Sequence, residues 1–410
     1  MKFPTRGMKA AAISPALREY ELDDAPFNRV WASTHRLHDA VRDASVQFTE
    51  KNYFFKTAFP SPSKLEAEVV SMVGDLLGHE GAVGSVTPGG TMSNILAVLA
   101  ARGNARKHRP EIKQPNIVGS MTMHPSVDKG GILMDIDIVR TAPTVDYKAD
   151  PATIEAAIDA NTIAIFCTAG TSNHGQIDPV AELGEIAAKH NVFFHVDACL
   201  GGFVIPFAKK LGYPGLPDAW DFRVPSVSSI SIDPHKLGLA AYPSSVQLYR
   251  TRELFEYQGF NLTNWTGGNY PSPGIEGSHS GAGIASAWAA IHLLGEEGYL
   301  ELIDQVLRAT RTLIEGVRGI EGLDIAVEPQ INVVAVASTS ARVSAYAVAE
   351  ALNRMGWRGI GRMRLPKCFR MVVMPHHEEI LDEFLGDMAT AVKQVERGEV
   401  TAPEDTPIYK

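Results

Sequence analysis

Three features that could do chemistry each fall at the end of a predicted strand. The segment 228–240, SSISIDPHKLGLA, reads as a strand that delivers Lys236 just beyond its end. Asp197 closes the apolar run VFFHVDA (192–198), where burying a carboxylate is costly unless the carboxylate pairs with a cation. The segment 87–94, TPGGTMSN, places two glycines and a threonine before an Ala/Leu-rich helix. Backbone N–H groups at such a helix start can bind an anion.

Each feature also has a plainer interpretation. Most lysines are surface residues, and glycine pairs are common in loops that lead into helices. The glycine turn is not a nucleotide P-loop, because no lysine follows it in the required frame. His195 and Asp197 point to the same face of one strand, which is compatible with a metal site, but no third ligand lies nearby. We therefore expect a satisfied buried histidine and no metal.

In combination, the three features match the needs of one cofactor. An amine forms an imine with an aldehyde, a glycine turn binds a phosphate, and a carboxylate keeps a pyridinium nitrogen protonated. Lys236, the turn at 89–91 and Asp197 would supply these groups. The sequence therefore predicts a site for pyridoxal 5′-phosphate.

The elements that must position these residues alternate between strands and helices. Short apolar or β-branched runs predict six strands, at 116–120, 136–142, 162–169, 192–198, 227–233 and 244–249. Helices between them have start signals: Asp-Pro pairs at 150–151 and 178–179, and a capping box of Ser63 with Glu66 in a helix before them. This alternation predicts an α/β fold with a mainly parallel sheet covered by helices on both faces. Sites in such sheets lie at the carboxyl ends of strands.

The pattern changes in the last third of the chain. A long helical stretch at 286–319, with breaks expected at Gly295 and Gly298, precedes alternating strand-like and helical segments. We predict an irregular N-terminal arm, a large cofactor-binding domain and a smaller C-terminal α+β domain, at residues 1–54, 55–300 and 301–410.

Composition and charge exclude several classes of protein. The 410 residues carry a net charge of −9, which argues against a surface for nucleic acid or for an anionic membrane. No apolar run approaches the roughly 18 residues of a membrane span, and the N-terminus lacks the apolar core of a signal peptide. The three cysteines, Cys167, Cys199 and Cys368, are too sparse for a disulfide framework, so we expect a cytoplasmic protein.

Several motifs together resemble the group II pyridoxal-phosphate decarboxylases of fold type I. In chain order they are TPGGTMSN, MHPSVDKG, GTSNHGQIDPV, HVDACLGGFVIPF and SISIDPHKLG, and the resemblance runs over about residues 55–380. Two branches are particularly similar. The stretch from HVDACLGG through NWTGGNYPSPGIEGSHSGAGIASAWAA resembles the sphingosine-1-phosphate lyases. The segments SIDPHK, VEPQINVVAV and FRMVVMPHH resemble the archaeal tyrosine/aspartate decarboxylases.

The resemblance implies roles for individual residues. Lys236 would hold the aldehyde of the cofactor, Asp197 would form a salt bridge with the ring nitrogen, His124 would stack on the ring, and Ala169 would pack near its other face. The phosphate contacts would be Gly90, Thr91 and His235, together with Gly277 and Ser278 of a loop that reaches the phosphate of the other subunit. The resemblance therefore implies a homodimer with two shared active sites.

The resemblance leaves two reactions open. Decarboxylation of an L-amino acid needs a bidentate arginine for the substrate carboxylate, and Arg370 is the candidate. Retro-aldol cleavage of a phosphorylated amino alcohol needs a base and cations for a second phosphate. The lyases carry Ser-Arg-Pro-Gly where this chain has residues 278–281, so His279 replaces an arginine. Tyr270 matches the lyase loop and is either a general acid or a packing aromatic, and His174 also matches the lyases.

We therefore expect a carbon–carbon lyase that decarboxylates an L-amino acid to its amine, with retro-aldol cleavage as the alternative. A third possibility is a protein that binds the cofactor without turnover, but the intact set of Lys236, Asp197 and His124 argues against it. Sequence similarity disfavours an aminotransferase. The pocket for the substrate side chain would be lined by the N-terminal arm, including Tyr53 and Phe54, and by a loop of the second subunit.

Overall fold

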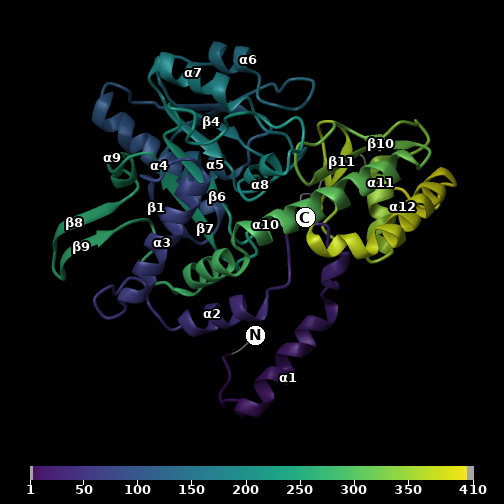
Figure 1. Ribbon diagram of the computed structural model, residues 1–410, viewed down its shortest axis with the longest axis horizontal. Coiled ribbons are helices and arrows are strands. Elements are labelled where there is room, and N and C mark those ends of the chain that lie inside the picture. Colours follow the sequence, from purple (N-terminus) through teal and green to yellow (C-terminus); the bar gives the residue numbers. More distant parts are fainter. Residues whose placement is uncertain (1–2, 404–410) are drawn as a thin grey trace.

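The computed structural model describes residues 3–403, and its larger part is built on a seven-stranded sheet (Figure 1). The strand order is β1-β7-β6-β5-β4-β2-β3. The strands are β1 (Val83–Thr87), β2 (Asn116–Ser120), β3 (Asp137–Thr141), β4 (Thr162–Thr168), β5 (Phe193–Asp197), β6 (Ser229–Ile232) and β7 (Ser245–Tyr249). The neighbours from β3 to β6 are parallel, whereas β7 and β1 run antiparallel to their neighbours. The predicted mainly parallel sheet is confirmed.

Helices cover both faces of this sheet, because successive strand residues point to opposite sides. In β4, Phe166 packs with α4 (Gly90–His108) and α5 (Ser126–Met134), while its neighbour Ile165 packs with the helices of the other face. That other layer contains α3 (Pro60–Leu76), α6 (Pro151–Ala156), α7 (Val180–His190) and α8 (Ile205–Lys210). A short helix, α9 (Arg252–Glu256), lies beside α4.

The C-terminal part is a second, antiparallel sheet in the order β10-β11-β13-β12. Its strands are β10 (Leu323–Ile325), β11 (Val333–Ser338), β12 (Gly361–Met363) and β13 (Cys368–Val372), covered by α11 (Ala345–Arg354) and α12 (Leu381–Glu396), with a 3-10 helix at Pro375–Ile380. The long helix α10 (Ala282–Arg318) runs from one sheet to the other (Figure 1). It is interrupted at Gly295, which has φ 57° and ψ −171°, but the second predicted break, at Gly298, is wrong. The proposed domain boundary at 300 falls within this helix.

The N-terminal segment is more regular than predicted. It contains α1 (Ala10–Tyr20) and α2 (Asp39–Phe48), with 3-10 turns at Glu21–Asp23 and Phe27–Arg29 between them. Helix α1 has no buried residue and extends away from the body (Figure 1), whereas α2 packs on α10. The expectation of an irregular arm is therefore wrong for much of this segment.

One side chain of the arm is fully buried in the C-terminal part. Trp31 has 0% exposure and stacks on His377, with ring centroids 4.0 Å apart and planes inclined by 19°. Its ring also lies 4.2 Å from that of Phe384 in α12. The arm is therefore anchored to the small sheet and its helices by an aromatic cluster.

The predicted capping box in the first large-domain helix is wrong. Helix α3 begins at Pro60, so Ser63 lies inside it. The Glu66 carboxylate instead accepts hydrogen bonds from the Tyr53 hydroxyl and from the Val86 backbone N–H. It thereby joins the arm to β1 rather than closing a helix end.

The two Asp-Pro signals have different outcomes. Asp150 caps α6 as predicted, because its side chain accepts a 3.0 Å hydrogen bond from the backbone N–H of Ala152. Asp178 does not cap α7, which begins at Val180. Its buried carboxylate accepts hydrogen bonds from the backbone N–H groups of Ala149 and Thr168, both at 2.7 Å. Asp178 of the second Asp-Pro pair therefore joins the segment before α6 to the end of β4.

The hairpin of β8 (Phe260–Trp265) and β9 (Gly268–Ser272), which projects from the body (Figure 1), was not among the predicted elements. In the sequence, Phe260 and Leu262 alternate with polar residues and a Gly-Gly pair follows at 267–268, which are hairpin signals, but all residues of β8 are exposed. In the described residues 3–403, no helix has the length and apolar character that crossing a membrane requires.

The anchoring of the arm can be tested by removing Trp31. Trp31→Ala should lower the free energy of unfolding by about 3 to 5 kcal/mol, the usual cost of deleting a buried aromatic ring. The measurement is urea denaturation followed by circular dichroism. Tyr20→Ala is the control, because this tyrosine is 76% exposed at the end of α1, a helix without buried residues, and its removal should change little. Equal midpoints for the two variants would contradict the anchoring.

His377 makes stability depend on pH. Its Nδ1 accepts from the Met374 N–H and its Nε2 donates to the Val30 carbonyl, so the buried ring is neutral, and burial lowers the pKa of His377 to about 3. The unfolded chain protonates near pH 6.5, so between pH 6.5 and 3 it binds more protons than the folded chain, and stability falls as pH falls. His377→Gln should remove about 1.4 kcal/mol per pH unit from the stability slope measured between pH 6.5 and 5. An unchanged slope would contradict this.

Candidate active site

The carboxyl ends of the parallel strands surround a cavity of about 340 Å³. Thr168 ends β4 and Asp197 ends β5, and the turn after β6 carries Lys236. Asp197 also lies beside Ser231 of β6 in the parallel register. The sheet therefore brings the predicted lysine and the predicted carboxylate to one cavity, at the edge where such sites are expected.

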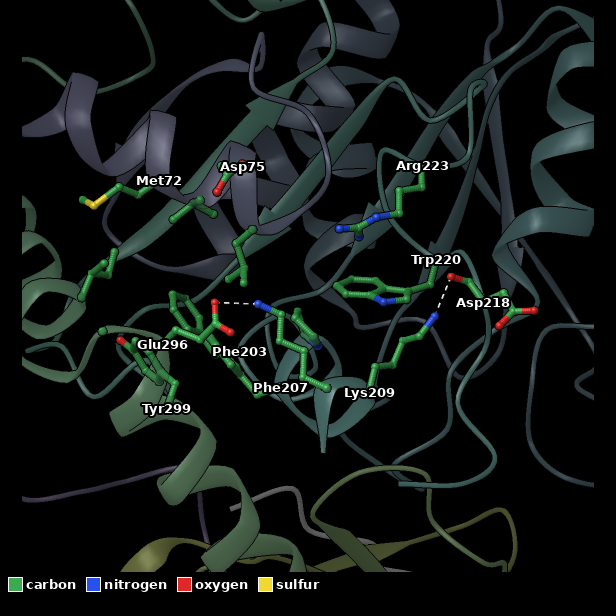
Figure 2. Close-up of a pocket in the computed structure, with 16 residues that line it drawn as sticks. Met72, Asp75, Phe203, Phe207, Lys209, Asp218, Trp220, Arg223, Glu296 and Tyr299 are labelled. Carbon is green, nitrogen blue, oxygen red and sulfur yellow. Dashed lines mark hydrogen bonds and ion pairs between the residues drawn. The ribbon is translucent and has the colours of Figure 1, made fainter. Parts of the chain in front are cut away.

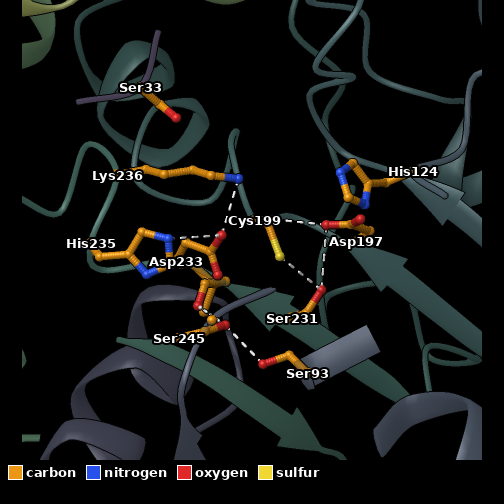
Figure 3. A network of polar contacts seen from close by, with 12 residues as sticks. Ser33, Ser93, His124, Asp197, Cys199, Ser231, Asp233, His235, Lys236 and Ser245 are labelled. Atoms are coloured by element: carbon orange, nitrogen blue, oxygen red, sulfur yellow. Dashed lines mark hydrogen bonds and ion pairs between the residues drawn. The ribbon is translucent and has the colours of Figure 1, made fainter. Parts of the chain in front are cut away.

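Lys236 is held by a second carboxylate that follows β6 (Figure 3). Its Nζ lies 3.0 Å from Oδ2 of Asp233, whose side chain is 2% exposed. Burial by itself would lower the pKa of Lys236, but Asp233 raises that pKa above its ordinary value. The free lysine is therefore an ammonium ion, and it must lose a proton before it can attack an aldehyde. The other oxygen of Asp233, Oδ1, is buried without a hydrogen-bond partner.

Asp197 is buried among hydrogen-bond donors. Its Oδ2 accepts from Nδ2 of Asn94 at 2.8 Å, and its Oδ1 accepts from the backbone N–H of Cys199 at 3.0 Å. Burial would raise the pKa of Asp197, but the imidazole of His124 when protonated, the Cys199 N–H and the charge of Lys236 together hold that pKa below its usual value. The carboxylate is therefore ionised and ready to bind a cation.

His124 reaches the cavity from the loop after β2 and lies beside Asp197 (Figure 3). Its Nδ1 is 2.9 Å from the hydroxyl of Ser126, and that hydroxyl accepts from Nδ2 of Asn94 at 2.8 Å. The same amide group thus orients both the predicted stacking histidine and the predicted ring-nitrogen partner.

The glycine turn at the start of α4 forms another wall of the cavity. Gly89 has φ 121°, and a Cβ at Gly90 would lie 2.5 Å from Sγ of Cys199 and 2.8 Å from Oδ2 of Asp233. Only glycine fits there, and the first backbone N–H groups of the helix have no partner within it. Thr91 also lines the cavity.

The remaining predicted phosphate contact from this chain, His235, lies on the same side of the cavity. Its Nε2 is 3.6 Å from Oδ2 of Asp233, and its other ring nitrogen is bonded to the Ser244 carbonyl. Gly90, Thr91 and His235 therefore line the same cavity as Asp197 and His124.

His195 is satisfied within the core. Its Nδ1 bonds to the hydroxyl of Ser229 at 2.7 Å and its Nε2 faces the amide oxygen of Asn94 at 3.1 Å. Burial lowers the pKa of His195 to about 4, so the ring is neutral. Within residues 3–403, no group of three metal-binding side chains is found.

Ala169 was predicted to pack near one face of the cofactor ring, but it lies away from the cavity. It is fully buried in the core and does not line the cavity, whereas its neighbours Thr168 and Gly170 do. Alternation along the strand end turns Ala169 away from the cavity when Thr168 faces it. The hydroxyl of Thr168 is buried without a partner, so it is the more suitable group at this position.

Four predicted site residues lie outside the cavity of the single chain. Arg370 is on β13 and is 8% exposed. Tyr270, on β9, packs against Phe54 with ring centroids 5.2 Å apart, and Gly277 and Ser278 follow β9 in the next loop. Their roles at the site stay predictions.

Three residues of the site were not singled out by the sequence: Asn94, Ser231 and Asp233. Asn94 follows Gly90 by one helical turn, and residues four apart in a helix lie on one side. Ser231 lies in β6, and Asp233 directly follows this strand two positions later, on the side to which Ser231 points if the alternation continues. The sequence spacing therefore indicated the side to which each of these residues points. Their contact partners lie on other elements and are visible only in the folded structure.

Comparison with known proteins agrees with this geometry. A family model described as the pyridoxal-dependent decarboxylase conserved domain matches residues 28–338. The chain belongs to this family. Membership implies pyridoxal 5′-phosphate as the cofactor.

Relatives of the chain fall into two groups. A sphingosine-1-phosphate lyase of Arabidopsis thaliana is 37% identical over 361 residues, which are 87% of this chain and 65% of the lyase. A probable L-aspartate decarboxylase of Archaeoglobus fulgidus is 36% identical over 387 residues, which are 93% of this chain and 100% of the relative. The structure of a sphingosine-1-phosphate lyase of Burkholderia pseudomallei has a TM-score of 0.89 and 32% identity, and the match covers 97% of this chain and 94% of the lyase.

The cavity fits the cofactor that the family implies. Lys236 offers an amine for its aldehyde, and the helix start at Gly90 offers free N–H groups and space that a Cβ would fill. The buried Asp197 offers a carboxylate that forms no ion pair with a lysine or arginine among the described residues. A protonated ring nitrogen would form an ion pair with that carboxylate.

The assignment of the lysine can be tested by spectroscopy. Lys236→Ala should lose the visible absorption of the covalently linked cofactor, and borohydride should no longer fix the cofactor to the protein. Absorption spectra and intact mass measure both effects. Lys113→Ala, at an exposed position on the surface, is the control and should behave like the wild type. A visible band and a fixed cofactor in the Lys236 variant would show that another lysine is used.

Proposed function

We propose that the protein decarboxylates an L-amino acid to its amine, with pyridoxal 5′-phosphate bound to Lys236. When bound, the cofactor supplies an electron sink for the electron pair left by the bond that breaks at the substrate Cα. The protein must hold the cofactor, orient the substrate and move protons at defined atoms.

In this proposal the cavity residues divide these tasks. Lys236 would hold the aldehyde, and Oδ2 of Asp233, 3.0 Å away, would accept the proton that the lysine must lose. Asp197 would keep the ring nitrogen protonated, because an ionised buried carboxylate favours a neighbouring cation. His124 would stack on the ring. Gly90, together with Thr91 and His235, would bind the phosphate.

Arg370 is the proposed partner of the substrate carboxylate. Its neighbours Phe369 and Met371 point into the core beneath α12, so Arg370 is on the other face of β13, which these helices do not cover. The turn that leads into β13 is tied to the cavity wall, because Nε2 of His174 lies 2.9 Å from the carbonyl of Leu365. The loop of His174 also carries Gly170 and Ser172, which line the cavity (170–174).

The observation that carries the choice of reaction is the charge of the cavity. Among the described residues, Lys236 is the only lysine that lines it, and no arginine does. A phosphorylated amino alcohol would need cations for its phosphate in addition to those of the cofactor site, whereas an amino acid needs one arginine from outside. Cleavage of a phosphorylated amino alcohol stays the second candidate, because two of the compared relatives are named sphingosine-1-phosphate lyases.

We also propose a homodimer with shared sites. The hairpin exposes Phe260, Leu262 and Trp265 at 54%, 37% and 52%, and Ile275 in the following loop is 54% exposed. Apolar side chains gathered on a projecting element favour a protein partner. A second copy of the chain on this surface would bring Gly277 and Ser278 towards its cavity.

The reaction can be tested with two assays in parallel. The holoenzyme should release CO₂ and an amine from at least one L-amino acid of a panel, and should release no aldehyde from a phosphorylated long-chain amino alcohol. Release of aldehyde without release of amine would show that the reaction is retro-aldol cleavage and not decarboxylation. Arg370→Lys should lower kcat/KM for the decarboxylated amino acid about 10- to 100-fold, because a bidentate charged hydrogen bond is lost.

Arg364→Lys is the matched control for that substitution. Arg364 is exposed at the turn before β13, in the same hairpin as Arg370, and its replacement should leave kcat/KM unchanged. Equal kinetics of the two variants would remove Arg370 from the proposal while leaving the assignment of the reaction to the product assays.

A further inference from the structure

A second cavity, of about 570 Å³, lies between α3, α8, α10 and the segment 218–223 (Figure 2). It shares no lining residue with the cavity around Lys236. Its volume lies in the range of about 300 to 1,000 Å³ that is usual for small-molecule sites. The predicted chemistry of the family makes no use of it, so its own side chains must indicate what it binds.

The walls of this cavity are aromatic. The ring of Tyr299 stacks on that of Phe207 at 5.0 Å and lies 5.4 Å from that of Phe203. Trp220, 2% exposed, lies across the cavity from these rings (Figure 2). Gly295, where α10 is interrupted, also lines the cavity, and a Cβ there would meet no atom within 4 Å.

The three cations of the lining are already bound to neighbouring groups. Nζ of Lys210 lies 2.7 Å from the carboxylate of Glu296. Nζ of Lys209 donates to the backbone carbonyls of residues 217 and 218 at 2.9 and 2.7 Å, and Arg223 pairs with Asp221. A ligand with a negative charge would therefore have to compete with interactions inside the protein.

Two carboxylates of the lining have no such partner. Within residues 3–403, neither Asp75 nor Asp218 makes a side-chain hydrogen bond or an ion pair. Asp75 also stands in the last turn of α3, which carries no basic residue. The carboxyl end of a helix is the negative end of its dipole, so this position favours a cation. Together with Asp221, the lining carries four carboxylates and three cations, and Lys209 binds backbone carbonyls, so one negative charge is left unbalanced. Asp75 and Asp218 are both exposed and therefore accessible to a ligand from solvent.

From these observations we propose that the cavity binds an organic ammonium ion with an aromatic or other apolar tail. The ammonium group binds the carboxylate of Asp75, and the tail packs between Trp220 and the rings of Phe203 and Tyr299. Aromatic faces add an attraction for the cation. This inference holds for either of the two reactions, because it uses no residue of the catalytic cavity.

One wall of this site also supports the catalytic turn. The hydroxyl of Tyr299 donates to the carbonyl of Gly238 at 2.9 Å, two residues after Lys236. Phe203 belongs to the segment that follows Asp197. The two cavities therefore share no lining residue, but both contact the segments that follow β5 and β6.

The test uses the holoenzyme and trimethyl(2-phenylethyl)ammonium, a quaternary cation that cannot react with an aldehyde. Isothermal titration calorimetry should give one site, with binding at least tenfold weaker for Asp75→Asn. It should also be at least tenfold weaker for Met72→Trp, which fills the cavity from α3. Asp43→Asn, an exposed carboxylate on α2, is the matched control and should bind like the wild type. Thermal unfolding shows whether each variant is folded.

Two further measurements locate the site and define its charge. Lys236→Ala should bind the cation unchanged, which separates this cavity from the catalytic one. The anion 3-phenylpropanoate should bind at least tenfold more weakly than the cation. Absence of cation binding, equal binding by Asp75→Asn, tighter binding of the anion, or loss of binding in Lys236→Ala would each overturn the proposal.

Discussion

The site depends on one constraint: a carboxylate is buried at the end of a strand without a cation of its own. Burying a charge costs free energy unless hydrogen bonds and an opposite charge compensate it. The protein gives Asp197 the amide of Asn94 and the N–H of Cys199, which fix its two oxygens, but pairs Lys236 with Asp233 instead. Asp197 therefore stays ionised and available. In the proposed function, the protonated ring nitrogen of the family's cofactor would balance it.

The sheet explains why these charges meet. Asp197 and Lys236 lie 39 positions apart but end neighbouring parallel strands, so both face the same edge. The connection from β6 to the antiparallel strand β7 spans residues 233–244 and carries Lys236. Within it a Cβ at Gly238 would lie 2.6 Å from the Pro234 carbonyl, so glycine is required there. The ion pair with Asp233, in the same connection, holds the ammonium group of Lys236 beside this carboxylate.

The sequence predicted the parts of this arrangement that have a local pattern. Buried strands are short apolar runs, and a charged residue at the end of such a run is conspicuous, which is how Lys236 and Asp197 could be found. Asn94 could not be found in the same way, because nothing near it in the chain indicates Asp197 as its partner. The strand β8 alternates apolar and polar residues over 260–263 but buries none of them, and the helices of the arm are short and largely exposed. Ala169 was assigned to the cavity, although the alternation of strand residues turns Thr168 towards it.

Asp197 and Asp233 both line the cavity, so two negative charges must be balanced there, and His235 lies beside one of them. Asp233 lies under the glycine turn, so a phosphate bound there would be repelled by this carboxylate unless positive charge stood between them. The Lys236 ammonium supplies that charge while the lysine is free. Nε2 of His235 lies 3.6 Å from Oδ2 of Asp233, so this imidazole is a second group beside the carboxylate that can bind a proton. Burial lowers the pKa of His235, and the charge of Asp233 opposes that effect. His235 can therefore balance the charge of Asp233 in addition to making its predicted contact with the phosphate.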